Sequence, residues 1–543
     1  MHSTSPLASL RPARGEVLER ARELFDLIKT REAYDNAVQQ RGAEALEAKI
    51  CATVTDICRL VSSRVSSAGG RAGIRFSGLH QLAQLIALPW PRNGSIAKKA
   101  VNADGVLPVL MTLMADSSHT SNHQIQREAV RVLGNISWRP EHADAVVGAG
   151  AIPPLVQLVS SPHDDLREMA MQVLDRLADA SPVARDSVLE GGVMEPLLTV
   201  VRSTTTTAVL RSGVSLVFAL CGGESAIFGE GTPPAVALVS ECLPVLAEVV
   251  GAPGQDEDVL SSAVFALQCL SEGGYHHADA VVVSGVCGRM VELATQSTVR
   301  DPIRVTVMRF LANTAAGPDD HRGALIECGV IPMIKTVLQA YPEGGTWQYE
   351  IAEMACWTVS TICAGTVAHI QAVLDEGIVP LLVNILSDGG SHEDSMHWRV
   401  RFVAANAIER AADEGSQQQV QYVIECGCIQ PLCDMLHRVS AISAINSILW
   451  AGLRKQQAEG LATNPYSTLV EQAGGVTKLV ELQRNDNHNT SMASMEVLFH
   501  HFPHRVDMQQ GVDDESDGLA DLDTDVGLDG EEDREERGEE EGG

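Results

Sequence analysis

The sequence contains few aromatic residues, few positive charges relative to negative ones, and no long uninterrupted apolar stretch. Phe, Trp and Tyr make up 4% of its 543 residues while 45% are hydrophobic, which favours helices packed through small aliphatic side chains over a β-sandwich. The net charge of −31 argues against direct nucleic acid binding, because phosphate contacts need basic patches, and it favours basic partners. No apolar stretch approaches the ~20 residues that span a bilayer, so we expect no membrane insertion.

Motifs for metal binding or catalysis are also missing. The twelve cysteines are scattered, and the closest group, Cys426, Cys428 and Cys433, has no fourth ligand nearby, so we expect buried thiols. His501 and His504 are separated by Pro503, which interrupts any helix between them and indicates a helix-end cluster. No phosphate loop, nucleophile elbow or carboxylate pair stands out. With no secretory signal at the start, the sequence predicts an intracellular, non-enzymatic protein without cofactors.

One phrase recurs along the chain. It reads "VVGAGAIPPLVQLV" at 146–159, "LIECGVIPMIKTVL" at 325–338 and "VLDEGIVPLLVNIL" at 373–386. Most intervals between its shared glycines lie between about 42 and 50 residues, and "SECLPVLAEVV" at 240–250 fills the one double interval. The glycines are Gly105, Gly150, Gly192, Gly285, Gly329, Gly377, Gly427 and Gly475.

Each copy indicates a short helix that ends at the glycine, a second helix opened by proline, and a longer third helix. Glycine stops a helix by taking the left-handed conformation, and proline fits the first turn of the next. Apolar residues at spacings of three and four in "EMAMQVLDRLA" (168–178) indicate the third helix. One such unit cannot bury its apolar face alone, so neighbouring units must stack into a solenoid. A three-helix unit of this length with a Gly-x-x-Pro corner resembles the armadillo repeat.

Longer phrases resemble one armadillo family. "ACWTVSTICAGTVAHIQAVLDEGIVPLLV" (355–383), "QQVQYVIECGCIQPLCDML" (418–436) and "YSTLVEQAGGVTKLVELQRNDN" (466–487) are similar to successive repeats of importin-alpha, also called karyopherin-alpha. The resemblance covers about four-fifths of the chain. It implies an all-α, right-handed superhelical solenoid of about ten armadillo repeats, for a divergent member of that family.

In the importin-alpha family the third helices line a concave groove and carry Trp and Asn four residues apart, so that both share one helix face. The indoles grip the stems of Lys or Arg, and the Asn amides bond an extended peptide backbone. By this resemblance we expect the retained peptide-binding residues to be Asn135, Arg309, Asn313 and Trp357.

At the other groove positions the expected Trp and Asn are replaced. Arg131 and Arg176 would point positive charge at a basic ligand and weaken the family's larger site, each by about 1 kcal/mol. The second, smaller site keeps Arg309, Asn313 and Trp357. The altered positions are Arg131, Gln172, Arg176, Ser215, Ala219, Phe265, Thr361, Asn406 and Arg410.

The two ends differ from the repeats. Residues 1–70 indicate a helical region in which the family's basic importin-beta-binding segment is degenerate or absent, because acids in 1–41 nearly balance the Lys and Arg. The repeats occupy 71–505. Residues 506–543 are expected to be a disordered acidic tail, since 513–541 hold sixteen acids against two arginines and could bury little surface.

The resemblance implies an adaptor that binds nuclear localisation signal peptides of cargo proteins and works in protein import, in the cytoplasm and nucleus. Importin-beta and an export receptor are the further partners that it implies. The alternative is a degenerate armadillo scaffold that binds a different protein segment outside nuclear transport. A pull-down that returns no transport factors but a reproducible different partner would favour this alternative.

Overall fold

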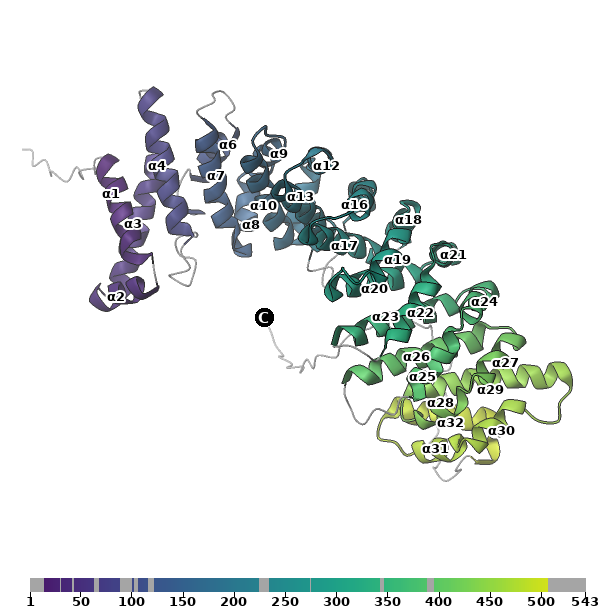
Figure 1. Ribbon diagram of the computed structural model, residues 1–543. Helices are drawn as coiled ribbons and strands as arrows, with labels where there is room; N and C mark the ends of the chain where they lie inside the picture. The colour runs from purple at the N-terminus through teal and green to yellow at the C-terminus, as the bar shows by residue number, and fades with distance from the viewer. Residues whose placement is uncertain are drawn as a thin grey trace, which may run out of the picture.

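The computed structural model describes residues 14–29, 31–41, 43–62, 68–87, 100–101, 106–115, 122–223, 234–273, 275–341, 346–387 and 395–505. Every regular element in these ranges is helical, and Figure 1 shows the helices stacked into one curved array. The expected all-α armadillo solenoid of about ten repeats is confirmed. Gly105 and the acidic residues 506–543 lie outside the described residues.

The long third helices form the inner layer of the curve. In Figure 1, α17, α20, α23 and α26 follow the inner side of the arc while α16, α18, α21 and α24 follow its outer side. Each inner helix packs against the inner helices of the neighbouring repeats. The inner helices are α4 (Ala68–Ile86), α7 (Asn122–Ser137), α10 (Asp164–Ala180), α13 (Thr207–Leu220), α17 (Glu257–Glu272), α20 (Asp301–Ala315), α23 (Thr346–Cys363), α26 (Ser395–Glu414), α29 (Val439–Glu459) and α32 (His488–His501).

The first and second helices of the repeats complete the solenoid. The first helices are α8 (Ala143–Gly148) with the 3-10 turn η1 (Pro140–His142) before it, α11 (Pro182–Glu190), α15 (Val236–Val239), α18 (Tyr275–Val283), α21 (Asp319–Glu327), α24 (Val367–Asp375), α27 (Gln417–Glu425) and α30 (Pro465–Gln472). The second helices are α6 (Val106–Ala115), α9 (Ile152–Val159), α12 (Met194–Ser203), α16 (Cys242–Gly251), α19 (Cys287–Thr295), α22 (Val330–Ala340), α25 (Ile378–Ser387), α28 (Ile429–Asp434) and α31 (Gly475–Leu482). Helix α16 is the repeat copy expected at 240–250.

Helical periodicity decides which side of each helix is buried. In α10, Leu166, Ala170, Leu174 and Leu177 recur at spacings of three and four and are all buried. Such stripes join into one hydrophobic core that runs from α1 to α32. Among the described residues no single helix is long and apolar enough to cross a membrane, although three bent helix pairs reach that length and composition when taken together.

Left-handed glycines turn the chain between the first and second helices, as the sequence predicts. Gly150, Gly192, Gly285, Gly329, Gly377 and Gly427 all have positive φ, between 75° and 87°. The expectation is wrong by one residue in the last repeat, where Gly474 takes the turn with φ of 75°. Gly475 begins α31 instead, and a Cβ on it would lie 2.6 Å from Cys433 Sγ. The close approach of Cys433 therefore explains why position 475 is also a glycine.

The N-terminal helices pack into the same core. α1 (Arg14–Ile28) buries Val17, Ala21, Leu24 and Ile28 and contacts α3 (Ala43–Ser62) and α4, while α2 (Arg31–Arg41) joins α1 to α3. α3 in turn contacts α6, and α4 contacts α7. The helical region expected at 1–70 is thus helical in its described part, and the domain boundary at residue 70 stays a prediction.

The cysteines near residue 430 serve packing. Cys428 and Cys433 are buried, and burial raises the pKa of each thiol to about 12. Cys426 is half-buried, and burial raises its pKa as well. These thiols are therefore protonated at neutral pH and behave as small apolar side chains.

Candidate functional site

Charged and amide side chains connect α17, α20 and α23 on the inner side of the solenoid. Arg309 Nη2 lies 3.7 Å from Glu350 Oε2 on α23. Asn313, one turn later on α20, donates through Nδ2 to Ser271 Oγ and Glu272 Oε1 on α17, each at 3.3 Å. The two predicted residues of α20 thus contact the inner helices on both sides.

The carboxylates of this cluster are held partly away from water. Burial raises the pKa of Glu353, and the ion pair with Arg399, whose Nε and Nη2 lie 3.0 and 2.9 Å from Oε1, opposes the rise. Glu272 is exposed as a whole residue, yet neighbouring atoms desolvate its carboxylate, and this desolvation raises its pKa. Hydrogen bonds from Asn313 and Gln268 lower the pKa and partly offset the rise. Negative charge in such surroundings attracts a cation more strongly than it would in bulk water.

Trp357 lies on the same helix as two of these acids. It follows Glu353 by four residues and Glu350 by seven, which places the three on one face of α23. Its indole is half-buried and packs against the core. Thr361, at the former Asn position, donates its hydroxyl to the carbonyl oxygens of Trp357 and Thr358 at 3.2 and 2.9 Å. Glu350 and Glu353 were not predicted from the sequence, although acids four and seven residues before the Trp were a usable signal.

In the first repeats, Arg131 already has a charge partner. Its Nη2 lies 2.6 Å from Glu128 Oε2 and 2.9 Å from His80 Nδ1, and the Glu128 side chain is only 3% exposed. Asn135 donates through Nδ2 to the carbonyl oxygen of Ala83 at 2.8 Å. The positive charge that the sequence assigns to this part of the groove is therefore largely balanced at Arg131.

Arg176 behaves differently, because it stacks on an aromatic ring. Its guanidinium carbon lies 4.8 Å from the centroid of Trp138, and its Nη1 donates to the carbonyl oxygen of Gly134 at 3.1 Å. Burial lowers the pKa of Arg176, with the carboxylate of Asp175 opposing the change. Trp138 is 71% exposed and directly follows the last residue of α7, Ser137. The sequence analysis did not single it out.

The other altered positions contribute mainly to contacts between repeats. Gln172 Nε2 donates to Glu168 at 3.1 Å and reaches Ser212 Oγ on α13 at 3.4 Å. Ser215 Oγ donates to Asp175 Oδ1 at 3.3 Å. The remaining four comprise the buried Ala219, Phe265 with its ring 5.8 Å from that of Phe218, the half-buried Asn406 and the exposed Arg410.

A second aromatic group lies near the C-terminal end of the inner layer. Trp450 is 39% exposed, and its ring centroid is 5.5 Å from that of His500 and 5.0 Å from that of His501. His501 Nε2 lies 3.0 Å from Asn446 Oδ1, and burial, helped by His500, lowers its pKa to about 4. Asn446 and Trp450 lie four residues apart on α29, and this spacing of an amide and an indole could have identified them.

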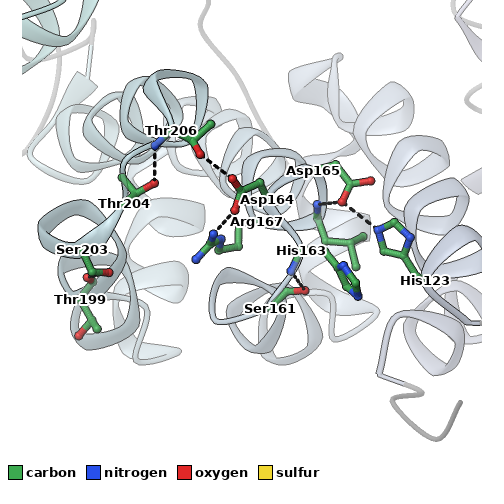
Figure 2. A network of polar contacts seen from close by, with 11 residues as sticks. His123, Ser161, His163, Asp164, Asp165, Arg167, Thr199, Ser203, Thr204 and Thr206 are labelled. Atoms are coloured by element: carbon green, nitrogen blue, oxygen red, sulfur yellow. Dashed lines mark hydrogen bonds and ion pairs between the residues drawn. The ribbon is translucent and has the colours of Figure 1, made fainter. Parts of the chain in front are cut away.

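Figure 2 shows a polar network at the starts of the inner helices α10 and α13. Asp164 accepts hydrogen bonds from Thr206 Oγ1 at 2.6 Å and from Arg167, and these two bonds lower its pKa. His123 Nε2 on α7 lies 2.8 Å from Asp165 Oδ1. The network joins three successive repeats along one edge of the inner layer and fixes the relative positions of their helices.

Comparisons with known proteins agree with this architecture. Residues 139–172 and 416–451 match the family model of the armadillo/beta-catenin-like repeat, and 464–516 match that of an atypical Arm repeat. The chain is 30% identical over 390 residues to importin subunit alpha-1b of Oryza sativa subsp. japonica, which covers 70% of this chain and 68% of the relative. It is 31% identical to importin subunit alpha-8 of Arabidopsis thaliana, over 73% of this chain and 83% of the relative. The crystal structure of an engineered protein, 22% identical, aligns with a TM-score of 0.64 over 82% of this chain and 98% of that one.

Proposed function

The chain belongs to the importin subunit alpha family, and we propose that it binds basic, extended peptides of cargo proteins on its inner face as a non-enzymatic adaptor for protein import into the nucleus. The observation that carries the proposal is the cluster on α17, α20 and α23, in which Glu272 accepts a hydrogen bond from Asn313 while Glu350 and Glu353 share one face of α23 with Trp357. Its chemistry suits a Lys or Arg side chain better than an acidic or apolar one.

Each contact of such a peptide is weak by itself. A cation on an exposed indole gains about 0.5–1 kcal/mol, and an exposed ion pair about 0.2–1 kcal/mol. Affinity therefore depends on several contacts along one peptide, in which the first one bound raises the effective concentration of the rest. An extended backbone supplies carbonyl and amide groups for Asn313, which can both donate and accept.

We place the main contact at α20 and α23 rather than in the first repeats. Arg176 already covers one face of Trp138, so a peptide cation would meet like charge there. Among the described residues no arginine is stacked on the Trp357 indole, and Glu350 and Glu353 on the same helix face neutralise Arg309 and Arg399. Binding to importin-beta, release by an export receptor, and presence in both cytoplasm and nucleus are parts of the proposal that rest on the family alone.

A second candidate function is a scaffold that binds a different, less basic segment. One observation favours it: the chain's own arginines stack on two exposed indoles, Arg176 on Trp138 and Arg438 on Trp398 at 5.0 Å. A groove lined in this way suits peptides with acidic as well as basic side chains. Import of a basic cargo and binding to a mixed-charge segment are therefore the two outcomes to separate.

Fluorescence anisotropy with a labelled Lys/Arg-rich peptide tests the proposal. We expect Trp357→Ala to weaken binding about five- to tenfold, and Glu353→Gln to weaken it and reduce its salt dependence. Trp347→Ala is the matched control, because Trp347 is 43% exposed at the start of the same helix but lies on another face. Equal binding by all variants, or preference for a mixed-charge peptide of the same length, would contradict the basic-peptide adaptor and favour the scaffold.

A further inference from the structure

A basic patch lies at the edge of the inner layer where α26, α28, α29 and α31 meet. We call it the Arg438 patch, and its members are Trp398, Arg401, His437, Arg438 and Lys478. Arg438, the residue directly before α29, places its guanidinium carbon 5.0 Å from the Trp398 ring centroid. Trp398 is 39% exposed and rests edge-on against Phe402, so its position is fixed by packing.

The cations of the patch outnumber the acids that face them. Among the described residues Arg438 has no ion pair, and Arg401 donates Nη2 to the carbonyl oxygen of Leu386 at 2.9 Å while its buried Nε has no partner. Lys478 alone is paired, with Nζ 2.7 Å from Asp434 Oδ1. The pKa of His437 is lowered, mainly by burial and then by Arg438, Arg401 and Lys478, which is consistent with a positive local field. The patch therefore suits an anionic ligand, in a chain whose net charge is −31.

The chain carries a segment of the opposite charge within reach. Residues 513–541 contain sixteen acids against two arginines. The last described residue, Arg505, follows α32, which packs on α29, which in turn packs on α26. Adjacent helices lie about 8–10 Å apart, whereas even the eight residues from Arg505 to Asp513 can span up to about 25 Å. Geometry therefore lets the acidic segment reach the patch of its own chain.

We infer that the acidic segment 513–541 docks on the Arg438 patch of the same chain. Guanidinium groups bind carboxylates with two parallel hydrogen bonds, and Arg438, which has no ion pair among the described residues, can offer such a pair of donors. The tether makes the encounter intramolecular, so an effective concentration in the millimolar range supports contacts that would be weak between separate molecules. Because the contacts are ionic and exposed, added salt should weaken the docking.

Carbodiimide cross-linking of the full-length protein, followed by peptide mass spectrometry of the monomer band, tests this inference. The reagent joins lysine amines to carboxylates that they touch, so we expect Lys478 to be joined to residues within 513–541. Lys335 is the matched control: its side chain is 37% exposed against 41% for Lys478, and it pairs with Glu376 at 3.1 Å. Cross-links of Lys478 to Asp434 and of Lys335 to Glu376 report that both lysines react.

The expected result is at least a fivefold excess of segment cross-links at Lys478 over Lys335, lost at 0.5 M salt and in Arg438→Glu. Arg202→Glu, the same charge change on the outer helix α12 at a side chain 47% exposed, should leave the excess intact. Equal yields at the two lysines would show an unbound segment and overturn the inference. Cross-links found only between two chains would overturn it as well, because the occupant would then be a second copy. Neither result bears on the binding of basic peptides at Trp357.

Discussion

Arg176 covers one face of the Trp138 indole from the neighbouring inner helix, with 4.8 Å between guanidinium carbon and ring centroid. Trp138 is 71% exposed, and the cation that lies over its ring belongs to the protein itself. Arg131 thus stands where the Trp was expected, and an exposed Trp lies seven residues later at position 138, directly after the end of α7.

Replacing Arg176 with Asn should restore cation binding in the first repeats. The shorter amide frees the Trp138 face and removes a positive charge, so we expect Arg176→Asn to bind a Lys/Arg-rich peptide about two- to fivefold more tightly, as a gain of about 0.5–1 kcal/mol implies. Fluorescence anisotropy titrations of the labelled peptide at constant salt concentration measure this gain in affinity. Arg202→Asn removes the same charge from the outer layer and should change little; an equal gain there would mean that only net charge matters.

Removing the buried partner of Arg131 should destabilise the first repeats. Glu128→Gln leaves the guanidinium, which is 36% exposed, without its carboxylate, and we expect a loss of about 1–3 kcal/mol in the free energy of local unfolding. Hydrogen exchange of α7 measures this loss. In the double variant with Arg131→Met the loss should be smaller than in Glu128→Gln alone. If the losses in unfolding free energy of the two single variants simply added in the double variant, the pairing of Glu128 with Arg131 would be contradicted.

Glu409 should make the stability of the C-terminal repeats depend on pH. Burial raises the pKa of Glu409 from 4.5 to about 7, so the folded state holds this proton more tightly than the unfolded one. The resulting stabilisation is complete below pH 4.5 and is lost as the pH rises through about 7. Glu409→Gln should therefore raise the free energy of local unfolding of α26 by about 1–3 kcal/mol at pH 8, and by less at pH 5.5. Slower hydrogen exchange of α26 measures this increase. Glu414→Gln, on an exposed side of α26, is the control and should show no such difference.

His501 should act in the opposite direction at the last repeat. Its pKa is lowered from 6.5 to about 4, so the stability that it contributes is present above pH 6.5 and is lost as the pH falls toward 4. We expect Trp450 emission to report loosening of α32 over this range. His501→Gln keeps a group that can donate to Asn446 but does not titrate, and it should flatten the pH dependence. An unchanged profile would place the titrating group elsewhere.

The sequence predicts the repeats well because their determinants are local. A glycine that must take positive φ and an apolar stripe at spacings of three and four act within one helix or turn, as at Gly377 and in α10. Even the error at Gly475 has a tertiary cause, the close approach of Cys433. The spacing of four residues between Asn446 and Trp450 on α29 is another local signal from which this pair could have been found.

The interactions of the groove side chains could not be predicted in the same way. Arg131 stands at an expected Trp position and Arg176 at an expected Asn position, and their partners differ in kind: Arg131 binds a buried carboxylate and Arg176 an exposed indole. His80 is 51 residues from Arg131, and Trp138 is 38 residues from Arg176, and neither separation equals the repeat period. Which partner a long side chain reaches depends on the offset between neighbouring repeats, and the sequence does not specify that offset.

The amide of Asn313 links two repeats before any ligand arrives, because it donates to Ser271 and Glu272 on the preceding inner helix. A peptide that takes over this amide must first release it from α17. Peptide binding at Asn313 therefore breaks a contact between two repeats, so the affinity of the site includes the free-energy cost of giving up these hydrogen bonds.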